Sequence, residues 1–169
     1  MKKIAVLIEQ QYQETEVWVP YYRLKEAGHQ AILVGPEKGK TYPSKFGYPA
    51  VAEADYKSIK AKDLAGVVVP GGFAPDFMRR SPDAAKLVAE VFKAGKMTAS
   101  ICHGAWILCS AGVLKGRRAT CFYAIADDVK NAGAKYVDEE CVVDGNLITS
   151  RKPEDLPAFC AALVQALAR

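Results

Sequence analysis

The 169-residue sequence has no apolar stretch long enough to cross a membrane and only two histidines. A transmembrane helix needs about 18 or more consecutive apolar residues, and no run in the chain reaches that length. Only two histidines are present, His29 and His103, and they stand far apart in the sequence. Zinc sites commonly use histidine ligands, so two widely separated histidines disfavour a zinc site. The sequence therefore predicts no membrane span, no metal and no cofactor.

A signal peptide and a run of basic residues are also missing. The segment from Met1 to Ile8 is too short for a signal peptide, and it runs directly into Glu9 with no small-residue cleavage site. The net charge is +4, from 23 basic and 19 acidic residues, but the basic residues are dispersed along the chain. Nucleic-acid binding is therefore not supported. We expect a cytoplasmic protein.

The cysteines show no disulfide or metal-binding pattern. Their number is odd, their spacing is irregular and no Cys-x-x-Cys pair occurs; they lie at positions 102, 109, 121, 141 and 160. Such a set fits a reducing compartment, in which thiols stay free.

Apolar segments rich in β-branched residues alternate with segments of helical pattern. Strands are predicted over Lys3 to Ile8, Gln30 to Val34, Gly66 to Val69, Met97 to Ile101 and Ala119 to Cys121, with a hairpin of Glu140 to Val143 and Leu147 to Thr149. Helices are predicted over Glu16 to Ala27, Ser81 to Lys93, His103 to Ala111, Ile125 to Asn131 and Pro153 to Ala168. The polar segment 36–63 is predicted to form short hairpin-like strands. This alternation predicts one α/β domain over residues 1–169, with a mostly parallel sheet and helices on both faces.

The segment Ser100-Ile101-Cys102-His103-Gly104 lies between a buried strand and a helix. A nucleophile between small residues at such a turn is typical of a nucleophile elbow. The free N–H groups at the start of the helix favour a thiolate, so the pKa of Cys102 is expected below the free-cysteine value of about 8.5. The alternative is a buried structural cysteine.

Further candidate residues follow other strands. Because parallel strands end at one edge of a sheet, the residues after Ile8, Val69 and Ile101 should converge. The N–H of Gly72 could form an oxyanion hole with the N–H of His103, although glycines also occur in ordinary loops. Glu16 and Asp76 are candidate acids, but each could simply stabilise the start of a helix. Likewise, His103 could be a catalytic base or a residue of the helix start.

The ordered motifs resemble those of the PfpI intracellular protease family, within the class I glutamine amidotransferase-like superfamily. The resemblance covers essentially the whole chain. It rests on Glu16-x-x-x-Pro20, Arg23-Leu24-x-x-Ala27-Gly28-His29, Pro70-Gly71-Gly72-x-Ala74-Pro75-Asp76, Ser100-Ile101-Cys102-His103-Gly104, Ala111-Gly112-Val113-Leu114-x-Gly116-Arg117, Asp127-Asp128-x-x-Asn131-Ala132-Gly133, Val142-Val143-Asp144-Gly145-Asn146 and Ser150-Arg151.

The resemblance implies a flavodoxin-like three-layer α/β/α sandwich with Cys102 as the nucleophile. It implies a protonated Glu16 that donates a hydrogen bond to the sulfur. It also pairs His103 with Asp76 of a neighbouring subunit, in a homodimer or higher homo-oligomer with a shared active site. Asp76 is one methylene shorter than the glutamate common in the family. The segment 122–124, Phe-Tyr-Ala, is a second departure and is expected to line the pocket.

Three functions fit these residues. In the first, a cofactor-free glyoxalase or protein deglycase for stress protection, Cys102 adds to a reactive carbonyl while Glu16 shuttles protons. In the second, an intracellular cysteine peptidase, His103 protonates the departing amine. The third is a redox sensor that is not an enzyme. The sequence contains no subdomain large enough to hold several peptide residues, which favours a small carbonyl substrate over a peptide.

Overall fold

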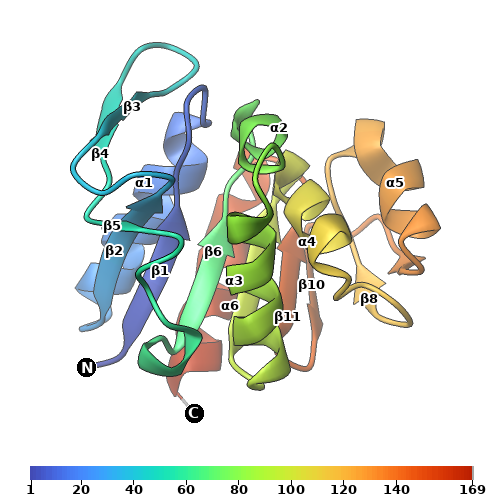
Figure 1. Cartoon of the computed structure of the whole chain (residues 1–169). Coiled ribbons are helices and arrows are strands. Elements are labelled where there is room, and N and C mark those ends of the chain that lie inside the picture. Colours follow the sequence, from blue (N-terminus) through green and yellow to red (C-terminus); the bar gives the residue numbers. More distant parts are fainter. Residues whose placement is uncertain (169) are drawn as a thin grey trace.

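A seven-stranded sheet forms the centre of the protein. The computed structural model describes residues 1–168, and the sheet has the strand order β10-β11-β7-β6-β1-β2-β5 (Figure 1). All neighbours in it are parallel except β10 and β11. The strands are β1 (Lys3–Leu7), β2 (Gln30–Gly35), β5 (Ala54–Asp55), β6 (Gly66–Val69), β7 (Met97–Ile101), β10 (Cys141–Asp144) and β11 (Leu147–Ser150).

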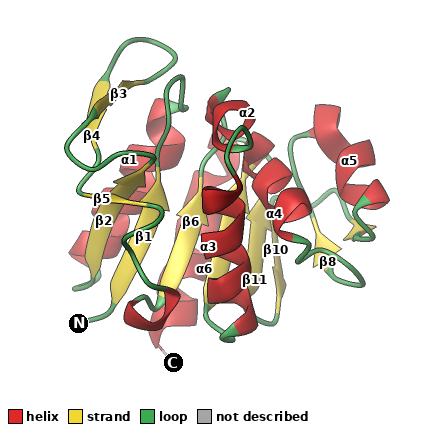
Figure 2. Cartoon of the chain, in the orientation of Figure 1, coloured by secondary structure: helices red, strands yellow, loops and turns green. Residues whose placement is uncertain are grey.

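Helices cover both faces of this sheet. In Figures 1 and 2, α3 and α4 lie in front of the strands, and α1 and α6 lie behind them. Each strand of the β6–β7 pair is buried along its whole length between the two helical layers. The predicted three-layer α/β fold is therefore confirmed. The helices are α1 (Glu14–Glu26), α2 (Ala74–Met78), α3 (Pro82–Lys93), α4 (Ala105–Ala111), α5 (Ala126–Asn131) and α6 (Leu156–Ala168).

Local signals explain where two of the helices begin. The Gln13 side chain accepts a hydrogen bond from the N–H of Thr15 at 2.7 Å, so α1 begins at Glu14, two residues earlier than predicted. Ser81 caps α3 by accepting from the N–H of Asp83, and proline follows it at the first helical position. The helix α3 therefore agrees with the predicted helix, which begins at a Ser81 cap and ends at Lys93.

The starts of the helices predicted from His103 and from Pro153 need correction. One 3-10 turn, Cys102–Gly104, precedes α4, and another, Pro153–Asp155, precedes α6. Tight turns of this kind are common where a chain enters a helix.

A strand was predicted over Ala119 to Cys121, but only Arg118–Ala119 forms one, β8. It pairs with β9 (Lys135–Tyr136), a strand that the sequence analysis did not predict, outside the main sheet. The next residue, Thr120, donates its N–H to the side-chain oxygen of Thr149 at 2.9 Å.

The polar segment 36–63 contains the predicted hairpin. Its strands β3 (Thr41–Pro43) and β4 (Pro49–Val51) are antiparallel and separate from the main sheet. The turn between them lies against the segment that follows β1, because the N–H of Lys45 donates to the carbonyl of Tyr12 at 2.9 Å. The following strand, β5, joins the edge of the main sheet beside β2. The hairpin thereby extends beyond the carboxyl end of the sheet (Figure 1).

The sheet reverses its strand order at β1, which pairs with β2 on one side and β6 on the other. The segments after β1 and β6 meet there: the N–H of Gln13 donates to the carbonyl of Gly71, and Tyr12 forms a bridge with Gly72. Cys102 follows β7, the next strand after β6. The predicted convergence at the carboxyl ends of the strands is confirmed for these segments.

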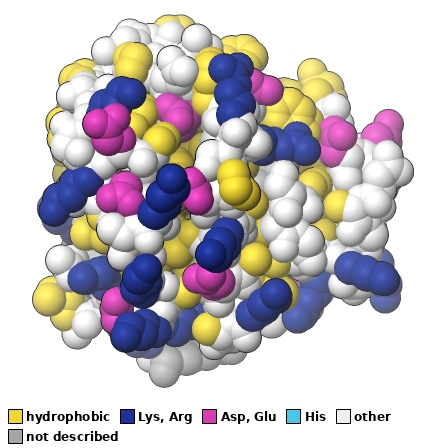
Figure 3. Space-filling view, in the orientation of Figure 1, with side chains coloured by type: hydrophobic (Ala, Val, Ile, Leu, Met, Phe, Trp, Pro, Cys, Tyr) yellow, Lys and Arg dark blue, Asp and Glu magenta, His cyan; other side chains and the backbone are white. Residues whose placement is uncertain are grey.

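The surface carries charges of both signs. On the face shown in Figure 3, lysine and arginine side chains are scattered and alternate with aspartate and glutamate. Over residues 1–168, no helix combines the length and the apolar character that crossing a bilayer requires.

Gly104→Ala is expected to lower the free energy of unfolding by about 1–3 kcal/mol, because the added Cβ would collide with the carbonyl oxygen of Val69. Gly28→Ala is the control: Gly28 has φ +80° but nothing within 4 Å of the added Cβ, so it tests conformational strain alone. Chemical denaturation measures both changes. An equal or smaller loss in Gly104→Ala would contradict the packing argument.

Candidate active site

Cys102 has an unusual backbone conformation at the end of β7. Its φ is +60°, in the left-handed region that residues other than glycine seldom adopt. The turn leaves the side chain 8% exposed and sets the sulfur against the backbone N–H groups of His103 and Gly72. This is the geometry of a nucleophile elbow, in which strain is held by the surrounding contacts.

Glu16 lies beside this cysteine, in the first turn of α1, and is completely buried. Its Oε2 accepts a hydrogen bond of 2.7 Å from the N–H of Gly71. Its Oε1 is buried without a hydrogen-bond partner of its own among residues 1–168. Only glycine fits at position 71, because a Cβ there would lie 2.8 Å from Oε2 and 2.9 Å from the Cβ of Cys102. The structure thus brings together the carboxyl and the sulfur.

Burial raises the pKa of Glu16 to about 7, although the N–H of Gly71 and the Cys102 thiol act to lower it. Burial and the charge of the Glu16 carboxylate raise the pKa of the Cys102 thiol to about 12, against the lowering effect of the two N–H groups. The sequence prediction of a lowered cysteine pKa is therefore wrong in direction. The N–H groups at the helix start do lower the pKa of Cys102, but the desolvation of the sulfur and the charge of an ionised Glu16 raise it by more.

The two groups titrate as a pair. Burial holds the first proton of the pair until about pH 7, and burial together with the charge of the ionised Glu16 holds the second to much higher pH. Between these steps one proton is available to both the sulfur and the carboxyl. A carboxylate with a pKa near 7 is well matched to accept the thiol proton during attack at neutral pH.

His103 lies beside the sulfur within the same chain. Its Nδ1 is 3.3 Å from the Sγ of Cys102. The left-handed turn at Cys102 changes the direction of the next side chain. The imidazole stacks on Phe122, with ring centres 4.9 Å apart, and burial lowers its pKa. Phe122, from the segment expected to line the pocket, therefore does contact a candidate site residue.

Asp76 is not brought to His103 within the chain. Its carboxylate pairs with Arg80 at 2.9 Å, and its side chain is 60% exposed. No hydrogen bond or ion pair joins it to His103 in the described part of the chain. Its pairing with His103 across subunits stays a prediction.

Lys45 is a residue near the site that the sequence analysis missed. It lies in the turn between β3 and β4, and its positive charge acts on both Glu16 and His103. Nothing in the local pattern marks it, because the segment 36–63 is polar throughout and only the fold places this lysine near the end of β7.

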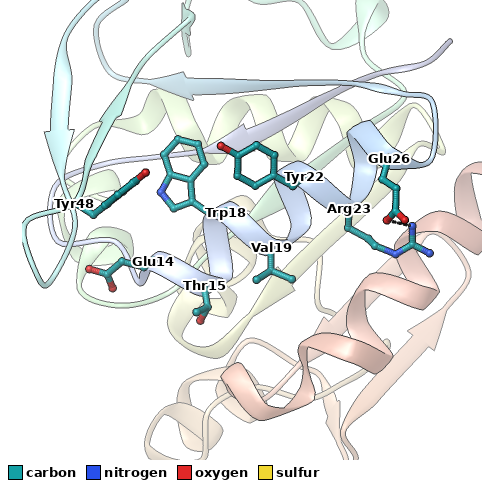
Figure 4. A pocket seen from close by; sticks show the side chains of 8 residues that line it. All are labelled: Glu14, Thr15, Trp18, Val19, Tyr22, Arg23, Glu26 and Tyr48. Carbon is teal, nitrogen blue, oxygen red and sulfur yellow. Dashed lines mark hydrogen bonds and ion pairs between the residues drawn. The ribbon is translucent and has the colours of Figure 1, made fainter.

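A groove of about 660 Å³ lies on the outer side of α1, and Figure 4 shows its aromatic wall of Trp18, Tyr22 and Tyr48. An ion pair of 2.8 Å between Arg23 and Glu26 closes one end. No cysteine lines this groove. We therefore take Cys102 as the centre of the candidate site, because the Glu16 carboxyl and the N–H groups of Gly72 and His103 lie against its sulfur.

These features define a class of protein: an α/β protein with a cysteine at a nucleophile elbow and a buried carboxyl against its sulfur. Sequence comparison gives the family. Residues 2–166 match the DJ-1/PfpI family, and the chain belongs to it. The resemblance seen in the sequence motifs is confirmed.

This chain has several relatives that are named as deglycases. It is 40% identical over 165 residues to Deglycase PfpI of Pyrococcus furiosus, covering 98% of this chain and 99% of that protein. It is 38% identical over 160 residues to Protein/nucleic acid deglycase 2 of Escherichia coli, covering 94% and 93% of the two chains.

A solved structure shares the fold closely. It is a two-domain protein from Anabaena variabilis with DJ-1/ThiJ/PfpI-like and ferritin-like domains, with a TM-score of 0.97 and 43% identity. The match covers 99% of this chain and 48% of that protein, so this chain spans about half its length.

The alkylation rate of Cys102 is expected to rise as pH increases through about 7, because Glu16 then loses its proton and can accept that of the thiol. Glu16→Gln should lack this step, since an amide does not titrate there. Stopped-flow alkylation by iodoacetamide from pH 5 to 10, with mass mapping to Cys102, measures both profiles. The same inflection in both proteins would contradict the pairing of Glu16 with the sulfur.

Proposed function

We propose that this protein is a cysteine enzyme that acts on reactive carbonyl compounds and on their adducts with proteins, as a cofactor-free glyoxalase or deglycase. The observation that carries the proposal is the buried Glu16, with a pKa of about 7, against the sulfur of Cys102. The names of its full-length relatives support the same assignment.

In the first step, the sulfur of Cys102 attacks the aldehyde carbon and forms a carbon–sulfur bond. The thiol proton passes to the Glu16 carboxylate, and the π electrons of the carbonyl move to its oxygen. The N–H groups of Gly72 and His103, which face the sulfur, would hold the developing negative charge. Return of the proton from Glu16 to this oxygen gives a neutral hemithioacetal.

With methylglyoxal, Glu16 then removes the proton from the carbon that carries sulfur and returns it to the neighbouring carbon, while the hydroxyl proton of the hemithioacetal passes to the oxygen on that neighbouring carbon. The two carbons exchange oxidation states through an enediol, so no external oxidant is needed. The product is a thioester of lactate with Cys102. Water cleaves it, lactate leaves and the thiol regains its proton. Each step uses one acid–base group and one nucleophile, both of which lie in this site.

Cys102→Ser is expected to lower the turnover of methylglyoxal to lactate by about 1,000-fold or more while the fold stays intact, because the hydroxyl is a far weaker nucleophile. Cys109→Ser is the matched control, since this cysteine lies on α4 and does not contact the site. Lactate formation, release of amine from a glycated peptide and hydrolysis of a fluorogenic peptide panel are measured in parallel.

The proposal expects methylglyoxal to be turned over faster than any peptide in the panel, because the aldehyde pathway needs no protonation of a leaving amine. Cys102-dependent peptide cleavage without lactate would overturn it in favour of a peptidase. Reversible oxidation of Cys102 in a protein that neither forms lactate nor cleaves peptides would favour the redox sensor.

We further propose that Asp76 of a neighbouring subunit holds His103 in a homo-oligomer of at least two subunits. Support comes from the exposure of Asp76 and from the lack of an acid bonded to His103 in the described chain. The ion pair of Asp76 with Arg80 is exposed and of a kind that contributes little energy, so rearrangement costs little.

Mixing Cys102→Ser and Asp76→Ala subunits should restore part of the activity that each variant lacks alone. In mixed assemblies, some sites combine an intact Cys102–His103 pair with an intact Asp76. Native mass spectrometry verifies the exchange of subunits, and sedimentation gives their number. A monomer, or no recovery after full exchange, would rule out the shared site.

A further inference from the structure

Lys45 is held beside the loop that carries Gly72 by backbone contacts to one short segment between them. On one side, the N–H of Lys45 donates to the carbonyl of Tyr12 at 2.9 Å. On the other, Tyr12 forms a bridge with Gly72, and the N–H of Phe73 donates to the carbonyl of Gln11 at 2.9 Å. The turn that carries Lys45 and the loop that carries the N–H of Gly72 are thus fixed to the same short segment.

The ammonium group of Lys45 lies beside two exposed aromatic rings. Its Nζ is 5.5 Å from the ring centre of Phe73 and 5.8 Å from that of Phe46. These rings are 57% and 81% exposed. An ammonium group over an aromatic face is attracted by the ring quadrupole. Lys45, Phe46 and Phe73 thus form a cationic rim with an apolar border. This rim lies next to Gly72, whose N–H is one of the two proposed oxyanion-hole donors.

The charge of Lys45 is unpaired within the described chain. No carboxylate of residues 1–168 lies within 4.0 Å of its ammonium. The nearby carboxylate of Glu14 is instead bonded to the hydroxyl of Ser44 and, at 2.9 Å, to the N–H of Phe46. Burial raises the pKa of Glu16 and lowers that of His103, and the charge of Lys45 acts to lower both. A cation that acts on both Glu16 and His103, the two groups that contact the sulfur, is well placed to meet a substrate bound there.

We propose that Lys45, bordered by Phe46 and Phe73, forms a subsite for an anionic group on the molecule that Cys102 attacks. The chemical class is a small carbonyl compound, or a carbonyl adduct of a side chain, that carries a carboxylate near the reacting carbon. This subsite deepens the proposed function, because it selects among reactive carbonyls by charge. The anion is attracted as it approaches, and the apolar rings exclude part of the water that would otherwise screen the pair.

Two alkylating reagents that differ in charge test the subsite without any substrate. Iodoacetate carries a carboxylate next to the carbon that the sulfur attacks, and iodoacetamide is its neutral counterpart. The ratio of their rate constants at Cys102, at one fixed pH, cancels differences in thiol ionisation because both react with the same sulfur. This readout does not depend on glyoxalase or deglycase turnover, so failure of the proposed function would leave it interpretable.

In Lys45→Gln, the iodoacetate-to-iodoacetamide ratio is expected to fall about fourfold, the effect of one charge several ångströms away in a mostly aqueous setting. Lys45→Arg should keep the ratio. In the unaltered protein, about 1 M salt should lower the ratio toward that of Lys45→Gln, since the screening length falls to about 3 Å.

Lys25→Gln is the matched control. Lys25 also lies over an aromatic ring, that of Tyr21 at 4.9 Å, but it is in the last turn of α1. That places it about 13 Å along the helix from Glu16. The iodoacetamide rate and the melting temperature verify that each variant is folded. An unchanged ratio in Lys45→Gln, or an equal fall in Lys25→Gln, would overturn the proposal.

Discussion

The burial of one carboxyl against one thiol is the constraint on which the site depends. Glu16 is removed from water and accepts one hydrogen bond from Gly71. Its pKa is raised from 4.5 to about 7, so the folded protein retains a proton that the unfolded chain has released over this interval. Its contribution to stability therefore falls as pH rises from 4.5 to 7, to a cost of about 3 kcal/mol above pH 7. The fold tolerates this cost, and the proposed chemistry uses the resulting base.

The sheet supplies the geometry that makes this burial possible. Three neighbouring parallel strands, β1, β6 and β7, end at the same edge, and each is followed by one part of the site. The glycine after β6 allows the carboxyl from α1 to approach the sulfur after β7, because there is no side chain between them. The left-handed backbone of Cys102 is held by the same crowding. The close approach of Glu16 to Cys102 therefore depends on the absence of a side chain at Gly71.

Family membership and site geometry support different parts of the functional assignment. The full-length match to DJ-1/PfpI proteins defines the fold and the family. Fold alone does not choose a substrate, because one fold supports many reactions. The acid–thiol pair supports carbonyl chemistry, while the rim formed by Lys45 and the two phenylalanines concerns which carbonyl compounds enter. The proposed activity and the proposed selectivity therefore rest on different residues.

The sequence by itself determined the elements whose signals are local. The strand Gly66–Val69 and the helix ending at Lys93 follow from an apolar run and a serine cap, and the small residues around Cys102 mark the elbow. The tertiary structure decided what depends on distant segments: the raised pKa of the cysteine, the approach of His103 and the position of Lys45. Desolvation and charge interactions depend on distance in space, which local sequence patterns do not encode.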